Sequence, residues 1–191
     1  IQVQDGDTIP TIITPAADVV DETSLSSGTI VKTGSVVADF GDDGPGTIAG
    51  NNVFSASGSK LGGALSSGGV PVVVSYANGV YTGKAGTQTV FTLSIGTDGS
   101  YTYRQFEQLD HADGTNPNDV ITLDFGVVAT DTDGDTASTT ITVNVKDDAP
   151  DAVNDSRTVG EEATISGNVM SNDTVGQDVA GKVTQVVFNG V

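Results

Sequence analysis

The sequence predicts an all-β fold, an antiparallel β-sandwich of the immunoglobulin/cadherin-like kind with long loops and calcium-binding turns. Short runs rich in β-branched and aromatic residues, bounded by Gly, Asn and Asp, dominate the chain, and no long apolar stripe at helical spacing occurs. The chain contains 25 Gly, which favours turns. Its 25 acidic residues are 21 Asp and 4 Glu, and because helices favour Glu over Asp, this bias also indicates loops and turns.

The predicted strands can be followed along the chain. The clearest runs span residues 70–76, 89–95, 100–103, 120–128 and 139–145. Asn78-Gly79 is a strong signal for a type I′ turn, so it should join the first run to a strand that begins at Val80. Apolar and polar residues alternate within the second run, which indicates one buried and one solvated face. Several antiparallel hairpins in series favour a sandwich.

Two acidic turns, each with a nearby Pro, suggest module joints. We therefore expect residues 1–24 to be the end of a preceding module and a linker, and residues 25–150 to form the main sandwich. Residues 151–191 should form a short β segment that packs on the sandwich or completes it. The stretch 49–69, rich in Gly, Ser and Ala, is expected to be a surface loop that is either flexible or lines a binding surface.

The charge balance restricts the partners and suggests a cofactor. Lys+Arg total 7 against 25 Asp+Glu, a net charge of -18, which excludes nucleic acid as a partner because its phosphates would be repelled. No run of 18 apolar residues occurs, so no segment is predicted to span a membrane. Without Cys, the fold must depend on its core or on metal. Oxygen ligands select Ca²⁺ over zinc or copper, so Ca²⁺ is the predicted cofactor.

The strongest predicted Ca²⁺ site consists of Asp131, Asp133 and Asp135. Alternating Asp side chains in a turn that contains Gly can converge on one cation. The loop is not an EF-hand, because its Gly falls at the fourth position and Thr142 occupies the twelfth. The alternative is a solvated hairpin turn, since Asp-Gly by itself favours turns.

Three other acidic clusters supply further candidate metal ligands. They are Asp147, Asp148, Asp151 and Asp155 at the second joint, Asp42 and Asp43 in a Gly/Pro turn, and Asp110, Asp113 and Asp119 in a loop that also contains Asn116 and Asn118. Calcium at the joint would stiffen the junction between modules, and the alternative there is a polar linker.

Asp110, Asp113 and Asp119 are also the predicted ligand-binding residues. A cation with an open position could accept a carboxylate from a partner, most simply from the C-terminus of a protein chain. The alternative is that these residues only cap a hairpin.

The single histidine, His111, argues against zinc and against catalysis. A zinc site would need Cys or more His, so zinc is not expected. No nucleophile elbow or phosphate-binding loop occurs, and no pair of catalytic carboxylates stands out among the many Asp. We therefore expect no enzyme, and a loop histidine beside Asp110.

Several motifs, taken in chain order, resemble the repeat of giant type I-secreted RTX adhesins of Gram-negative bacteria. They are Phe40–Gly46, Gly69–Val72, Leu109–Gly114, Leu123–Val127 and Asp131–Ala137. Residues 151–155 and 160–169 resemble the start of a cadherin-like repeat from the same proteins. The Gly-Gly-x-Gly-x-Asp nonapeptide that gives RTX proteins their name is absent.

The resemblance implies export of the unfolded chain by type I secretion, followed by folding in extracellular Ca²⁺ at the cell surface. It implies a calcium-dependent ligand-binding (adhesion) module that recognises a protein or peptide on a host or other cell and adjoins neighbouring adhesin modules. One alternative is a Ca²⁺-rigidified structural extender or spacer. Another is a carbohydrate-binding module, which the low aromatic content and the absence of Trp disfavour.

Overall fold

The computed structural model confirms the all-β sandwich. The structure describes residues 8–42, 44–59, 63–113, 116, 118–148 and 153–173. Its elements are β1 (Thr11–Ile13), β2 (Asp18–Asp21), the 3₁₀ helix η1 (Glu22–Ser27), β3 (Ile30–Ser35), β4 (Val37–Asp39), β5 (Thr47–Ser57), β6 (Ser66–Ser67), β7 (Val70–Ala77), β8 (Val80–Ala85), β9 (Gln88–Ile95), β10 (Ser100–Gln105), β11 (Val120–Thr130) and β12 (Thr136–Lys146). The described part of the chain contains no helix with the length and apolar character that crossing a membrane would need.

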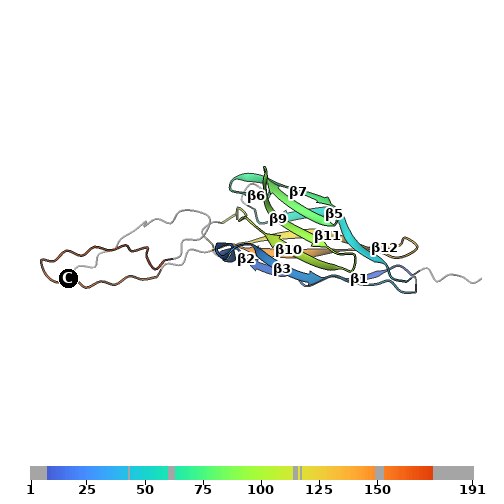
Figure 1. Ribbon diagram of the computed structural model, residues 1–191, viewed down its shortest axis with the longest axis horizontal. Helices are drawn as coiled ribbons and strands as arrows, with labels where there is room; N and C mark the ends of the chain where they lie inside the picture. Colours follow the sequence, from blue (N-terminus) through green and yellow to red (C-terminus); the bar gives the residue numbers. More distant parts are fainter. Residues whose placement is uncertain are drawn as a thin grey trace, which may run out of the picture.

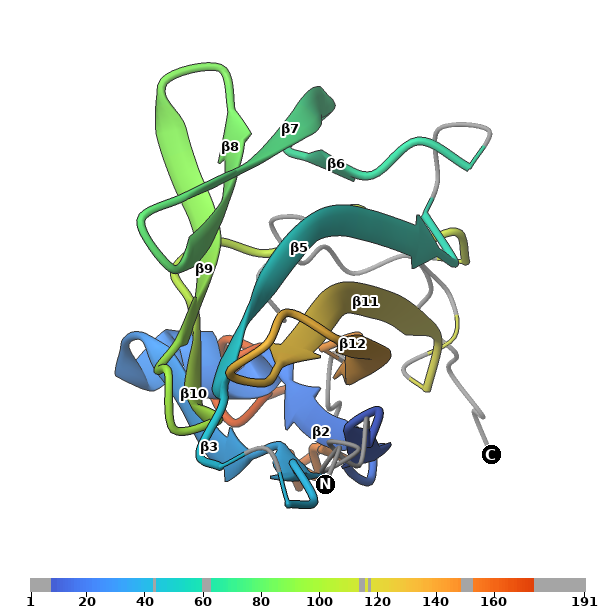
Figure 2. The same cartoon turned by 90° about the vertical axis from the view of Figure 1, so that its right-hand side faces the viewer.

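Two sheets face each other across the core (Figure 2). One has the strand order β3-β10-β9-β8-β7-β6, and the other has the order β2-β12-β11-β5. A separate two-stranded ribbon pairs β1 with β4. The pairings are antiparallel except for β2, which runs parallel to β12 with Asp21 opposite Lys146. This parallel pair decides which residues meet beyond the ends of the two strands.

The core is built around Phe125, which is fully buried on β11. Its ring centroid lies 5.2 Å from that of Phe54 on β5 in the same sheet. From the opposite sheet, the rings of Tyr81, Phe91 and Tyr103 lie 5.4, 5.8 and 6.3 Å away. Tilted and edge-on contacts of this kind are favourable for aromatic rings. The predicted alternation of buried and solvated positions therefore produced the interface between the sheets.

The prediction of a loop at residues 49–69 is wrong over its first part. Those residues begin within β5, an 11-residue strand that pairs with β11. The small residues serve close packing here. A Cβ on Gly50 would lie 2.5 Å from a ring carbon of Tyr76 and 2.7 Å from one of Tyr81. The small residues that suggested a flexible loop therefore allow β5 to pack closely against two aromatic rings.

The predicted turn at Asn78-Gly79 is confirmed between β7 and β8. Both residues have positive φ angles, 51° and 79°, as a type I′ turn requires. Asn and Gly tolerate this left-handed conformation better than other residues, so the local sequence determines this hairpin.

The sandwich is elongated, with β1 near one end (Figure 1). Residues 153–173 extend beyond the other end, contain no strand, and are exposed apart from the partly buried Met170 and Asp173. The ends of this segment meet, because Asp173 Oδ1 accepts a hydrogen bond from the Val153 amide at 2.8 Å. The proposed domain boundaries, including the pairing of residues 151–191 with the sandwich, stay a prediction.

Candidate functional site

The turn between β11 and β12 brings together the three carboxylates of Asp131, Asp133 and Asp135. Each residue offers a carboxylate oxygen, and these oxygens lie within 4.8 Å of one another. Asp131 also shapes the turn: its Oδ1 accepts hydrogen bonds from the amides of Gly134 at 3.0 Å and Asp135 at 2.7 Å. Gly134 has a φ of 107°, which favours glycine.

One oxygen in this turn stands out. Asp131 is only 7% exposed, and its Oδ2 has no hydrogen-bond partner among the described residues. A buried carboxylate oxygen without a partner is costly unless a cation satisfies it. The three carboxylates could hold a cation, and their oxygen atoms are of the kind that Ca²⁺ takes as ligands.

Two of the three predicted ligand-binding residues, Asp110 and Asp119, accept hydrogen bonds from backbone amides. Asp110 Oδ2 accepts a hydrogen bond from the amide of Gly69 at 2.9 Å. Asp119 accepts from the amides of Asp113 at 2.9 Å and Val120 at 3.0 Å. Asp110, Asp113 and Asp119 do not form a three-carboxylate group within 4.8 Å among the described residues. These contacts support the capping interpretation for Asp110 and Asp119, and the ligand-binding role stays a prediction.

The remaining predicted ligands that the structure describes, Asp42 and Asp155, belong to neither of the groups of three close ligand atoms found among the described residues. Asp42 is exposed, and its amide donates to Thr8 Oγ1 at 3.3 Å. Asp155 is exposed on the 153–173 segment. Asp43 and Asp151 lie outside the described residues.

At the second joint, Asp147 and Asp148 are buried, with 3% and 5% of their surface exposed. These two positions therefore do not resemble a solvated linker. Glu22 and Asp147 each follow directly after a strand of the parallel pair, at the residues beyond Asp21 and Lys146. The Asp147 amide also donates to the backbone oxygen of Asp119 at 3.0 Å. The register of β2 on β12 thus places two carboxylates side by side at one end of the sandwich.

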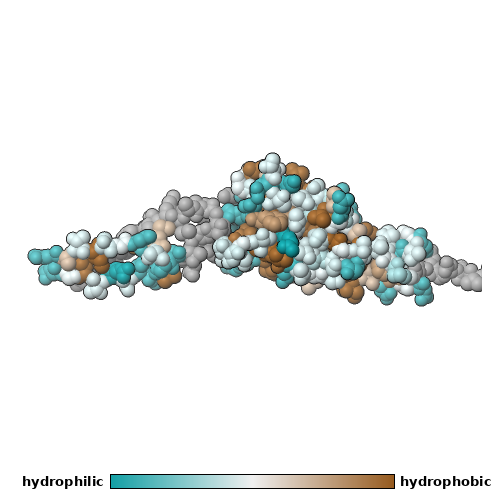
Figure 3. Space-filling view, viewed as in Figure 1, coloured by the Kyte–Doolittle hydropathy of each residue, from teal (hydrophilic) through white to brown (hydrophobic). Residues whose placement is uncertain are grey.

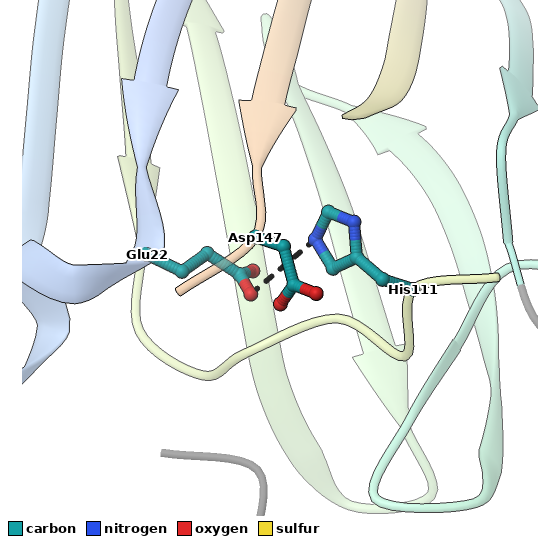
Figure 4. Close-up of side chains that lie close together, drawn as sticks. All are labelled: Glu22, His111 and Asp147. Atoms are coloured by element: carbon teal, nitrogen blue, oxygen red, sulfur yellow. Dashed lines mark ion pairs between the residues drawn. The ribbon is translucent and has the colours of Figure 1, made fainter. Parts of the chain in front are cut away.

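His111 completes this second cluster, as Figure 4 shows. Its Nε2 lies 3.5 Å from Glu22 Oε2, and both side chains are fully buried. One ligand atom from each of Glu22, His111 and Asp147 lies within 4.8 Å of the other two. The β10–β11 loop that carries His111 is anchored by a bridge to Ser59.

Burial and charge oppose each other in this cluster. Burial by itself would lower the pKa of His111, but the contact with Glu22 and the charges of Asp147 and Asp119 raise it overall. Burial raises the pKa of Glu22, and its contacts with His111 and other donors offset only part of that effect.

Glu22 is not among the residues that the sequence predicted for a site, and His111 was expected to be a loop histidine beside Asp110. Glu22 carries no local motif, and its only signal is that it is one of very few Glu residues in an Asp-rich chain.

A groove of about 420 Å³ lies between β5, residues 63–65 just before β6, and β7. Its lining includes the apolar side chains of Phe54, Ala56, Leu65, Val72 and Val74. β5 is one edge strand of its sheet, and β6 is one edge strand of the other. Figure 2 shows these edges facing each other, and Figure 3 shows that the visible face of the sandwich is mostly polar or neutral with small apolar patches.

Comparison with known proteins gives one match. The profile of a family described as "Domain of unknown function (DUF5801)" matches residues 18–146. No curated protein and no solved structure matches the chain. The matched range contains the Asp131 turn, the groove, and Glu22 and His111 of the second cluster, and Asp147 is the residue directly after it.

Proposed function

The chain belongs to the DUF5801 family, and from this premise we propose that it is a calcium-dependent ligand-binding module of a large bacterial RTX adhesin. Its partner would be a protein or peptide on a host or other cell surface. It would be exported by type I secretion and act outside the cell, next to neighbouring adhesin modules. The adhesin origin depends on the motif resemblance, and the calcium dependence depends on the sites described above.

The observation that carries the proposal is the buried Oδ2 of Asp131 beside the carboxylates of Asp133 and Asp135. Ca²⁺ binds such carboxylate oxygens in flexible geometry and would offset their mutual repulsion. Thr130, the residue before this turn, is paired with Thr47 at the start of β5. An ion in the turn would therefore order the start of β5, whose later residues line the groove.

The groove supports a binding role for the module. Its apolar lining and the edge position of β5 suit an extended peptide, which could contact the groove side chains while running along a strand edge. The net charge of -18 favours a basic or neutral segment over an acidic one.

The alternative is a structural spacer with joints that calcium makes rigid. One observation favours it: the two clusters lie at opposite ends of β12. Asp131, Asp133 and Asp135 precede Thr136, and Asp147 of the other cluster follows Lys146. Ions at both ends would stiffen a module in a tandem chain without any ligand.

Peptide titration separates the two roles. The full chain is presented with a panel of short peptides, each with a free and an amidated C-terminus, in Ca²⁺ and in EDTA. Ala64→Arg places a long side chain at the exposed rim of the groove, and Val73→Arg is the matched control at a 70% exposed position that does not line the groove.

The proposal predicts binding in Ca²⁺ that Ala64→Arg abolishes and Val73→Arg preserves. Loss of binding on amidation would identify carboxylate capture, and equal binding would identify capture along the groove. If no peptide binds while Ca²⁺ still raises the unfolding midpoint, the module is a spacer. If Ca²⁺ changes neither binding nor stability, both forms of the proposal fail.

A further inference from the structure

We propose that Glu22, His111 and Asp147 form a binding site for a Zn²⁺-class ion that closes the end of the sandwich at which β2 and β12 finish. The site would be structural, because all three residues are buried. It is separate from the Asp131 turn, and it does not depend on the proposed function.

The first support is a set of buried polar atoms that lack hydrogen bonds. His111 Nε2 and Glu22 Oε2 face each other as an ion pair, but neither atom makes a hydrogen bond to a described residue, and His111 Nδ1 makes none either. Both side chains have a relative exposure of 0%. Leaving such atoms unsatisfied in a protein interior costs free energy, whereas a metal ion would satisfy one nitrogen and the oxygen together.

The second support is the spacing of the two facing atoms. His111 Nε2 and Glu22 Oε2 are 3.5 Å apart, longer than the usual N–H···O distance of about 2.7–3.2 Å. Zinc–nitrogen and zinc–oxygen bonds of about 2.1 Å in tetrahedral geometry separate two ligand atoms by about 3.4 Å. The pair thus has the separation of two metal ligands.

The third support is the way in which the Glu22 carboxylate is oriented. Its other oxygen, Oε1, accepts hydrogen bonds from the Leu109 amide at 2.9 Å and from Gln105 Nε2. Gln105 is positioned in turn by the Tyr103 hydroxyl, which donates to its Oε1 at 3.0 Å. Outer partners that fix one oxygen and leave the other directed at the cluster are typical of metal ligands.

The ligand types favour zinc over calcium at this site. Imidazole nitrogen suits Zn²⁺, whereas Ca²⁺ takes oxygen ligands. With a neutral imidazole, two ionised carboxylates would carry a charge of about −2, which a divalent ion would neutralise in the buried site. The expectation against zinc counted only Cys and His, and it did not include the carboxylates that the fold brings to His111.

An ion here would connect three distant parts of the chain: the start of η1, the β10–β11 loop and the residue after β12. Metal binding that joins segments distant in sequence contributes directly to the stability of the fold.

The single histidine makes a direct test available. Untagged, ¹⁵N-labelled protein has only one pair of imidazole nitrogen resonances. One equivalent of Zn²⁺ should shift the Nε2 resonance into the metal-bound range and leave Nδ1 much less changed, whereas millimolar Ca²⁺ should leave both in place. Unchanged imidazole resonances with Zn²⁺, or equal shifts with Ca²⁺, would overturn the proposal.

Affinity measurements on near-isosteric variants provide a second test. His111→Gln and Glu22→Gln should each weaken Zn²⁺ binding by more than the roughly 10–100-fold typical of losing an outer-shell partner. Asp98→Asn, at a turn carboxylate outside both clusters, should leave Zn²⁺ affinity unchanged. Folding of each variant is checked by near-UV circular dichroism. Equal Zn²⁺ affinity in wild type and in a folded His111 or Glu22 variant would reject the site, while the wild-type imidazole spectrum decides the outcome if both variants fail to fold.

Discussion

Removal of the Asp133 carboxylate should destabilise the protein in Ca²⁺ but not in EDTA. Asp133 is exposed, and its carboxylate lies within 4.8 Å of those of Asp131 and Asp135. The turn itself is held by Asp131 Oδ1, which accepts the amides of Gly134 and Asp135. In Asp133→Ala this turn should persist, the ion should lose a ligand, and carboxylate repulsion without the ion should decrease.

The expected magnitude follows from the linkage between binding and folding. A site filled at a hundredfold excess of Ca²⁺ over its Kd stabilises the native state by about 2.7 kcal/mol. A tenfold to hundredfold weaker Kd would remove about 1.3–2.3 kcal/mol of this. For a domain of this size, that corresponds to a decrease of about 3–9 °C in the unfolding midpoint.

Thermal and urea unfolding in millimolar Ca²⁺ and in EDTA would measure the effect. Asp98→Ala is the matched control, because Asp98 Oδ1 also accepts from a turn amide, that of Ser100 at 3.0 Å, but lies outside both clusters. The control should lose similar stability in both conditions. The reasoning is refuted if Asp133→Ala loses equal stability with and without Ca²⁺, or if Ca²⁺ leaves the wild-type midpoint unchanged.

Three further predictions concern the scaffold. Tyr81→Phe should lower the free energy of unfolding by about 1–3 kcal/mol, because the buried Tyr81 hydroxyl donates to the Gly126 carbonyl at 2.7 Å; a change below about 0.5 kcal/mol in urea unfolding would contradict this. The pKa of Asp98 should lie below its ordinary value because Ser100 hydrogen-bonds the charged carboxylate, so the associated stability is present above the unfolded-state pKa and is lost as the pH falls. Ser100→Ala should raise that pKa in an NMR titration, and an unchanged value would show that another group lowers it. Gly79→Ala should cost about 1–2 kcal/mol in thermal unfolding, because the residue has a φ of 79° and the new Cβ would lie 3.2 Å from a backbone oxygen; an unaltered midpoint would exclude strain there.

Local features of the sequence determined much of the scaffold and one of the two clusters. Alternation placed Phe91 and Leu93 in the core, and Asn78-Gly79 formed the expected turn. The carboxylates of the Asp131 turn converge because alternating residues of one short turn cannot move far apart. Such interactions depend only on neighbours in the chain, so a residue pattern is enough to predict them.

The tertiary structure alone decided the role of β5 and the second cluster. The first part of the Gly-rich stretch became a strand because it pairs with β11, and Gly50 leaves room there for two aromatic rings from the other sheet. Glu22 meets Asp147 because β2 pairs in parallel with β12, and His111 joins them from a loop anchored at Ser59. No local pattern encodes a strand register between distant segments, because that register is set by which faces the whole chain can bury together.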